Sequence, residues 1–411
     1  MRLKELTRGW DMNCNLKKMW PIATLSLMSI TALLQADNRF GFLLGNSQKT
    51  PKKTEQECKT VAPVKKKAGE GPDRVINPST NPRVTEADVN IFLAAFLWNA
   101  HEDGLEFVID NEVSPSQFQG NLVDADYKNP HFKWNWGFKV GAGYAMNRDG
   151  WDVDLLWTHF HTHAKKNVQA DSNSTLLPLW SGFASTAGGA LTATNANADW
   201  KLHLDLLDLE LGREFWTSRW LTLRPFIGLR GVRIHQKYDI EHMGGSFGVA
   251  PNFFTNKVHL KDYFKGVGIR AGLNTDWEFG CGFSAYGNFA VSIIYGRFNV
   301  KDKENNHEVQ SPFSTIQVVD TEDHFRASKA ITDLALGLQW RDNFWKDRLG
   351  LTVAFGWENH IFFNQNQFFS VNRVGSTASG TLPNNSGQNV FEQRKGDLST
   401  QGWTLSVQFD F

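Results

Sequence analysis

Cysteines and long apolar runs are both scarce in this sequence. Three cysteines in 411 residues are too few for a disulfide-stapled scaffold. Mean hydropathy is −0.39 and a single long apolar stretch occurs, which excludes a bundle of transmembrane helices. Basic and acidic residues balance at 43 each, so nothing in the charge suggests a nucleic-acid partner.

Aromatic residues and glycine are abundant instead. The chain contains 16 Trp, 31 Phe and 35 Gly. Many aromatics and glycines without long apolar runs are typical of short strands joined by turns rather than of packed helices.

The single apolar stretch, at 19–36, has the features of a secretory signal. Lys17 and Lys18 precede it and the small residue Ala36 ends it. We expect residues 1–36 to be a signal peptide for export through the inner membrane, cleaved after Ala36, with a retained N-terminal anchor as the alternative. Of the cysteines that remain, Cys58 and Cys281 lie far apart in the sequence, and we expect free or intermolecular thiols.

Residues 37–86 differ in composition from everything that follows. They are rich in Lys, Pro, Thr and Gly and carry ten basic and six acidic residues. Such a segment buries too little apolar surface to order itself, so a flexible periplasmic tail is expected, with a plug or wall-binding role as the alternative. The rest of the chain, 87–411, then carries a net charge of −7.

From about residue 89 the hydrophobic pattern has a period of two. Apolar and small or polar residues alternate over 134–146 and resume after a short turn at 151–158, as in a hairpin of two strands. The unit recurs three times, and a final strand stands alone. These segments are 200–215 with 220–234, 263–278 with 283–298, 330–340 with 349–361, and 401–411. The alternation slips at Leu206 and Leu207, which suggests a β-bulge.

Short turns alternate with long polar connections at 160–199, 236–260, 299–328 and 364–398. Outer-membrane barrels sort their connections in this way, with short periplasmic turns and long extracellular loops. The predicted fold is therefore all-β, an antiparallel up-and-down transmembrane β-barrel over 87–411. Eleven strands are recognisable, including one at 105–110. Because bacterial barrels use even numbers, we expect about 12 strands, with 10–16 possible.

Aromatic residues cluster at the short turns, where an interfacial girdle is expected. Its predicted members are Tyr144, Trp151, Trp216, Trp220, Trp277, Phe283, Trp340 and Trp345. The chain also ends on a strand with Phe409 and a terminal Phe411, which resembles the signal that outer-membrane barrels present to the barrel assembly machinery. That machinery and outer-membrane lipid are accordingly the expected partners.

Three stretches resemble the major outer membrane protein family of chlamydia-like bacteria, a family of porins. They are FLAAFLW at 92–98 with HEDGL at 101–105, WGFKVGAGY at 136–144, and DGWDVDLLWTH at 149–159. The resemblance implies passive diffusion of small hydrophilic solutes or ions through an outer-membrane porin. Chlamydial members are rich in cross-linking cysteines, and this chain is not, so a disulfide-linked envelope lattice is not expected.

A porin needs a polar wall and luminal charges rather than a catalytic group. The predicted inward set is Lys139, Asp152, Asp154, Arg224, Arg230, Arg270, Asp276, Glu278, Asp333, Arg341 and Glu358. An alternative to a pore lining is that these charges pair with one another across the wall and hold a closed barrel. The alternative function is a surface adhesin or structural envelope protein without an open pore. The net charge of 87–411 predicts a weak preference for cations.

Other chemistry has little support in the sequence. The lipase motif Gly-x-Ser-x-Gly is absent, and we expect no enzyme and no cofactor. His159, His161 and His163 share one face of a strand, a spacing that can bind a metal, but no carboxylate or cysteine stands beside them in sequence, so no metal site is expected. A homo-oligomer is compatible with the sequence but not demanded by it.

Overall fold

The computed structural model describes residues 89–146, 150–181, 191–248, 254–311, 313–344, 349–374 and 388–411. The expected signal peptide 1–36, the expected tail 37–86, Cys58 and the girdle residue Trp345 lie outside these ranges. In the described chain no helix is long and apolar enough to cross a membrane.

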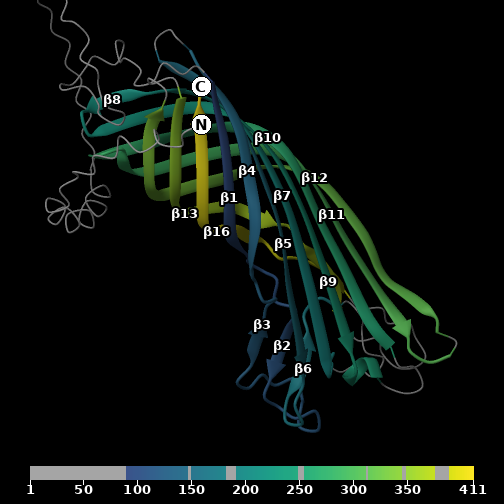
Figure 1. Cartoon of the computed structure of the whole chain (residues 1–411). Coiled ribbons are helices and arrows are strands. Elements are labelled where there is room, and N and C mark those ends of the chain that lie inside the picture. Colours follow the sequence, from purple (N-terminus) through teal and green to yellow (C-terminus); the bar gives the residue numbers. More distant parts are fainter. Residues whose placement is uncertain are drawn as a thin grey trace, which may run out of the picture. The chain divides into compact units, whose positions relative to one another are not determined.

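Ten antiparallel strands form a closed barrel (Figure 1). In order around the wall they are β1 (Val89–Glu102), β4 (Trp134–Ala145), β5 (Trp151–Gln169), β7 (Asn195–Arg213), β9 (Leu221–Met243), β10 (Phe254–Gly280), β11 (Phe283–Glu308), β12 (Thr315–Phe344), β13 (Leu349–Asn366) and β16 (Gly396–Asp410). Pairing of β16 with β1 closes the ring, so every wall strand has two partners. The short β8 (Phe215–Ser218) pairs with the start of β9.

The barrel prediction is confirmed, and its ten strands lie within the expected range of 10–16 but are two fewer than the expected 12. The predicted strand at 105–110 lies outside the wall. There β2 (Val108–Asn111) pairs with β3 (Asp126–Lys128) and with β6 (Thr175–Pro178) in a separate three-stranded sheet. The segment cannot join the barrel because both edges of β1 are already occupied, one by β4 and the other by β16.

Two of the predicted long connections, 236–260 and 299–328, are mostly strand. The actual connections there span only 244–253 and 309–314, and β12 is 30 residues long. At about 3.3 Å per residue such a strand measures about 100 Å, several times the ~25 Å of an outer-membrane apolar band. The barrel wall therefore continues well past the membrane at its long-strand end, where β10, β11 and β12 project (Figure 1). The two remaining hairpin strands, β14 (Phe369–Val374) and β15 (Gln388–Gln393), follow β13.

The outer face of the wall is mostly apolar next to the short turns and mostly polar beyond them. Leucine, isoleucine, valine and aromatic side chains next to the turns are exposed, among them Leu93, Leu155, Leu229, Ile269, Ile293, Leu336 and Leu405. Burying such side chains in lipid is favourable, and the alternation of β-strand side chains turns the intervening polar residues inward. This apolar band is the part of the wall that is suited to a bilayer.

Beyond the band the pattern reverses, and the apolar side chains point inward. In β9, Ile234, Tyr238 and Ile240 are buried, whereas His235 and Lys237 between them face outward. Aromatic side chains fill the lumen at this level, with Phe264 and Phe298 at 4.5 Å between ring centroids. The long-strand half of the barrel thus has a packed, mainly hydrophobic core with some buried polar groups, rather than a polar channel.

Segments between the strands complete this core. Trp180, next to β6, donates from Nε1 to the carbonyl of Glu106 at 2.7 Å and packs edge-on against Tyr238 and Phe368. Asp262 in β10 accepts the backbone N–H of Gln367 at 3.2 Å. It lies beyond the apolar band, and burial raises the pKa of its carboxyl to about 7. We call the buried set formed by 105–108, 175–181 and 367–369 with the strand residues that they cover the aromatic plug.

The free thiol expected at Cys281 is not observed. Cys281 is disulfide-bonded and lies in the two-residue turn between β10 and β11, in a left-handed conformation with φ of 57°. Separation along the sequence does not exclude a disulfide, because folding can bring distant cysteines together.

Candidate functional site

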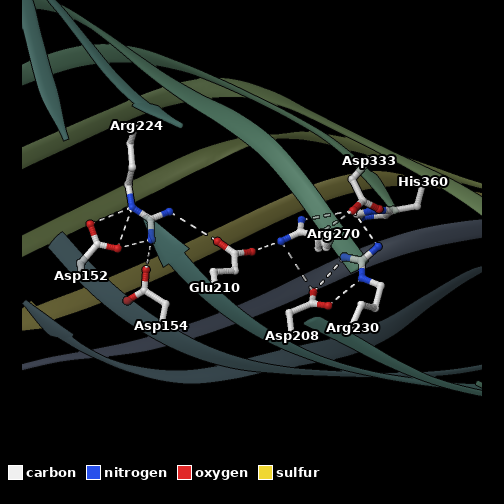
Figure 2. A network of polar contacts seen from close by, with 9 residues as sticks. All are labelled: Asp152, Asp154, Asp208, Glu210, Arg224, Arg230, Arg270, Asp333 and His360. Carbon is white, nitrogen blue, oxygen red and sulfur yellow. Dashed lines mark hydrogen bonds and ion pairs between the residues drawn. The ribbon is translucent and has the colours of Figure 1, made fainter. Parts of the chain in front are cut away.

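A network of ion pairs crosses the lumen inside the apolar band. Its members come from seven different strands. They are Lys139 on β4, Asp152 and Asp154 on β5, Asp208 and Glu210 on β7, Arg224 and Arg230 on β9, Arg270 on β10, Asp333 on β12, and Glu358 and His360 on β13. Figure 2 shows all of them except Lys139 and Glu358. We call this set the luminal network.

The inward orientation of these side chains follows from the strand period of two. Residues 208 and 210 lie on one face of β7, as 224 and 230 lie on one face of β9. Glycines on the inner wall leave room for the long side chains. A Cβ at Gly212 would lie only 2.6 Å from the Arg224 guanidinium carbon, so any larger residue at 212 would clash with the arginine.

Arg224 occupies the end of the network nearer the short turns. Its Nε lies 3.0 and 3.1 Å from the two carboxylate oxygens of Asp152, its Nη2 lies 2.6 Å from Asp154 Oδ2, and its Nη1 lies 3.4 Å from Glu210 Oε2. Figure 2 shows the guanidinium in the middle of these three carboxylates. One arginine thus holds β5, β7 and β9 together from inside the barrel.

Arg230 and Arg270 continue the network towards Asp333. Arg230 binds Asp208 in bidentate geometry, at 2.6 Å from Nε and 2.8 Å from Nη2, and its Nη1 lies 2.8 Å from Asp333 Oδ2. Arg270 donates from Nη2 to Asp333 at 3.1 Å and forms a short ion pair with Glu210. Only 1% of Arg230 is exposed, so this central pair is cut off from solvent.

His360 and Lys139 extend the network to the far wall. His360 Nδ1 lies 2.8 Å from Asp333 Oδ1, and its Nε2 lies 3.5 Å from Glu358 Oε2. Lys139 then pairs with Glu358 at 2.7 Å. The network contains six carboxylates and four permanent bases, so its formal charge is −2, or −1 when His360 is protonated.

A polar cavity of about 460 Å³ adjoins the network inside the barrel. Its walls include network members such as Arg224 and Asp333, and also Trp216, Asp276 and Asp410 near the short-turn end. Water and small ions fit a polar cavity of this size. The lumen therefore has a polar half next to the short turns and an apolar half, closed by the aromatic plug, beyond them.

Most of the predicted pore-lining residues meet in the luminal network, and three lie apart from it. Asp276 and Arg341 line the cavity nearer the short turns, where Asp276 accepts Gln339 Nε2 at 3.0 Å. Glu278 is 6% exposed and is not among the cavity-lining residues. Their role in a pore stays a prediction.

Sequence reasoning missed Asp208, Glu210 and His360. The predicted bulge at Leu206–Leu207 is wrong, because β7 pairs with β5 and β9 without a register shift. Leu206 points into the apolar half of the lumen and is 3% exposed, whereas Leu207 points outward and is 50% exposed. Two adjacent leucines were the signal of the change from lipid-facing to core-facing apolar residues. Reading them correctly would have placed residues 208 and 210 in the lumen.

The predicted girdle is placed on the outer surface with one exception. Tyr144, Trp151, Trp220, Trp277 and Phe283 are exposed, and Trp340 is half-buried. Trp216 is a correction, because it is 4% exposed and lines the cavity, having been turned inward by the pairing of β8 with β9. At the C-terminal end Phe411 is exposed and exchanges backbone hydrogen bonds with Val89, with Phe409 6.5 Å away between ring centroids.

His159, His161 and His163 lie on the outer face of β5, outside the lumen. Folding places a carboxylate, Asp205, beside His159, although none is adjacent in sequence. His159 Nδ1 lies 2.7 Å from Asp205 Oδ1, and His161 lies against His203 with ring centroids 4.7 Å apart. Among the described residues, no group of three or more histidine, cysteine, aspartate or glutamate side chains is placed to hold a metal ion.

A closed antiparallel barrel with an apolar outer band and a polar interior defines the class of outer-membrane β-barrels. The chain belongs to the family described as Legionella pneumophila major outer membrane protein precursor, whose sequence model matches residues 84–411. The expected outer-membrane family is thereby confirmed, although the matching family is the Legionella one and not that of chlamydia-like bacteria. No curated protein matches the chain.

Solved outer-membrane barrels are similar in architecture at very low sequence identity. The outer membrane protease OmpT of Escherichia coli is 10% identical, with a TM-score of 0.36 over 82% of this chain and 100% of that one. The toluene transporter TodX of Pseudomonas putida is 9% identical, with a TM-score of 0.27 over 82% and 93% of the two chains. A FadL homologue of Pseudomonas aeruginosa is 6% identical, with a TM-score of 0.22 over 79% and 91%.

Proposed function

We propose that this outer-membrane protein is a porin, a passive channel for small hydrophilic solutes or ions, and that the luminal network is its constriction. The observation that carries the proposal is the change in lumen chemistry along the barrel. At the level of the apolar band the interior holds a connected set of charged side chains and a cavity of about 460 Å³, whereas beyond the band it is filled mainly with apolar side chains.

Stability alone does not account for a charged interior. Replacing buried ion pairs by well-packed apolar side chains is often neutral or stabilising, and this chain fills the other half of its own lumen mainly with apolar side chains, beside buried polar groups such as Asp262 and Glu304. Ionisable groups at membrane depth that face a cavity typically mark a path for solutes or ions. The network therefore favours transport over a purely structural interior.

The aromatic plug makes the proposed channel a gated one. Trp180, Phe368 and Tyr238 pack together in the lumen between the polar cavity and the long-strand end. Trp180 and Phe368 belong to connecting segments rather than to the wall, so they can move without breaking the barrel pairing. We propose that solutes pass when these segments move aside.

Conductance of the purified full chain in a planar bilayer tests the proposal. We expect rare, discrete conductance steps from the wild type and a higher open probability from the double variant Trp180→Ala with Phe368→Ala. The matched control is Tyr127→Ala, which truncates a 62% exposed aromatic on β3 of the same small sheet. Folded barrels of wild type and double variant that both give no steps would refute a channel.

A structural or adhesive surface protein without a pore is the second candidate. It is favoured by the length of β9 to β12, of 23, 27, 26 and 30 residues, which carries the wall far beyond the apolar band. A diffusion channel needs no such projection. Absence of conductance together with cell-surface accessibility of these strand ends would favour this candidate.

A further inference from the structure

Four basic side chains stand side by side on the outer face of the barrel. In the antiparallel register Arg233 of β9 is opposite Lys265 of β10, Lys265 is opposite Arg297 of β11, and Arg297 is opposite Arg326 of β12. All four residues are exposed. We call them the basic row.

The basic row marks the edge of the apolar band. One outward position nearer the short turns, Val267 is 62% exposed and Tyr295 is 56% exposed, and the next positions are Ile269 and Ile293. On the other side of the row the outward residues are polar and the apolar ones point inward. The row therefore lies where lipid headgroups meet the wall. Since long connections face outward in such barrels, the leaflet concerned is the outer one.

The side-by-side arrangement is unfavourable without an anion. Directly opposed side chains in a sheet have Cβ atoms about 5 Å apart, and like charges there destabilise the pairing. Asp205, which is opposite Arg233, pairs instead with His159. Over the described part of the chain, no carboxylate forms an ion pair with any member of the basic row.

Several bases farther from the apolar band have partners within the protein. Lys301 lies 2.7 Å from Glu322, Lys257 lies 3.3 Å from Glu241, and Lys165 lies 2.9 Å from Asp199. Lys237 and Lys261, however, are exposed and directly opposite each other, and within the described ranges no carboxylate forms an ion pair with them. What distinguishes the basic row is its place at the edge of the apolar band, and this place indicates that its partner comes from the membrane.

We propose that the basic row binds the phosphorylated headgroup of an outer-leaflet glycolipid whose acyl chains lie along Val267, Ile269 and Ile293. The arginine fork matches phosphate oxygens in bidentate geometry, and a lysine adds a point charge between the arginines. Headgroup and chains would be held at once, because the charged row and the apolar surface are continuous on β10 and β11. The ligand is therefore a lipid with a phosphorylated headgroup rather than a free anion.

Native mass spectrometry of the full chain in mild detergent, titrated with bis-phosphorylated lipid A, tests the proposal. The variant is Lys265→Gln with Arg297→Gln. Each base near an anionic surface changes binding by about fivefold, so we expect about 30-fold weaker binding from the two together. The matched control, Lys257→Gln with Lys301→Gln, removes the same charge from bases already paired in the protein, and binding within about twofold of wild type is expected.

Two further titrations separate lipid from free phosphate. Dephosphorylated lipid A is expected to bind as weakly as the variant binds bis-phosphorylated lipid A, and inorganic phosphate is expected not to displace the lipid. Unchanged heat-modifiable mobility of both double variants checks that they fold. Equal weakening by variant and control, equal binding of the dephosphorylated lipid, or displacement by inorganic phosphate would each overturn the proposal.

Discussion

Replacement of Arg230 by methionine tests whether the luminal network is sealed from water. Arg230 makes a bidentate pair with Asp208 and a third contact with Asp333, and its side chain is 2% exposed. Its removal leaves Asp208 with only a distant contact to Arg270, at 4.0 Å. Removing one partner of a buried pair costs about 3–5 kcal/mol, because the other charge stays buried and uncompensated.

The loss in free energy of unfolding should largely disappear when the unpaired carboxylate of Asp208 is removed as well. We expect the double variant Arg230→Met with Asp208→Leu to recover most of the loss, since an apolar replacement of a buried pair is often near neutral. The control Lys301→Met breaks a solvent-exposed pair with Glu322 and should change the free energy of unfolding little.

Urea titration of the barrel in lipid vesicles, followed by fluorescence of its 14 tryptophans, measures these free energies of unfolding. A loss of 3–5 kcal/mol corresponds to a change of roughly 10²- to 10⁴-fold in the unfolding equilibrium. If Arg230→Met costs no more than Lys301→Met, the network is solvated and the lumen is water-filled at its centre, contrary to the packing described above.

Further predictions concern backbone, exposure, processing, pH and ion flow. Gly268→Ala should destabilise the barrel by about 1–3 kcal/mol in the same titration, because its Cβ would collide with the backbone of Ile293 and Ile294. In a cysteine-free background a water-soluble thiol reagent should label Asp154→Cys faster than the lipid-facing Leu155→Cys, and the reverse order would contradict the assigned faces. N-terminal sequencing should find Asp37 first, and a retained Met1 would refute cleavage. Because folding raises the pKa of Asp262 from 3.8 to about 7, wild-type stability should fall more steeply than that of Asp262→Asn as pH rises from about 4 to 7. Reversal potentials should indicate a weak cation preference that Arg270→Ala increases, and a clear anion preference would contradict it.

The lipid-facing surface of the barrel could be predicted because one environment governs it. At the level of the bilayer every outward residue meets lipid, so Leu155, Leu336 and Leu405 follow from alternation alone. The same rule predicted an inward position for Lys139 and Asp333. Beyond the bilayer the outer surface meets water while the inner surface is a packed core, so the alternation keeps its period and changes its phase. In β10 the change falls between Lys265 and Val267, and the mostly polar residues that precede it in sequence resemble a loop.

The partners within the lumen could not be predicted because they depend on how the sheet closes. Lys139 meets Glu358 across 219 residues of sequence, and Arg230 meets Asp333 from a strand three places away around the wall. Barrel diameter grows with the number of strands, so the same inward charges would be farther apart in a barrel of twelve strands. Distance then decides their role, since charges that touch form cross-links, whereas charges separated by water set the field that a passing ion meets. The strand count is therefore the quantity on which the functional reading of these residues depends, and it is fixed by which segments leave the wall, as β2 does, rather than by any charged residue.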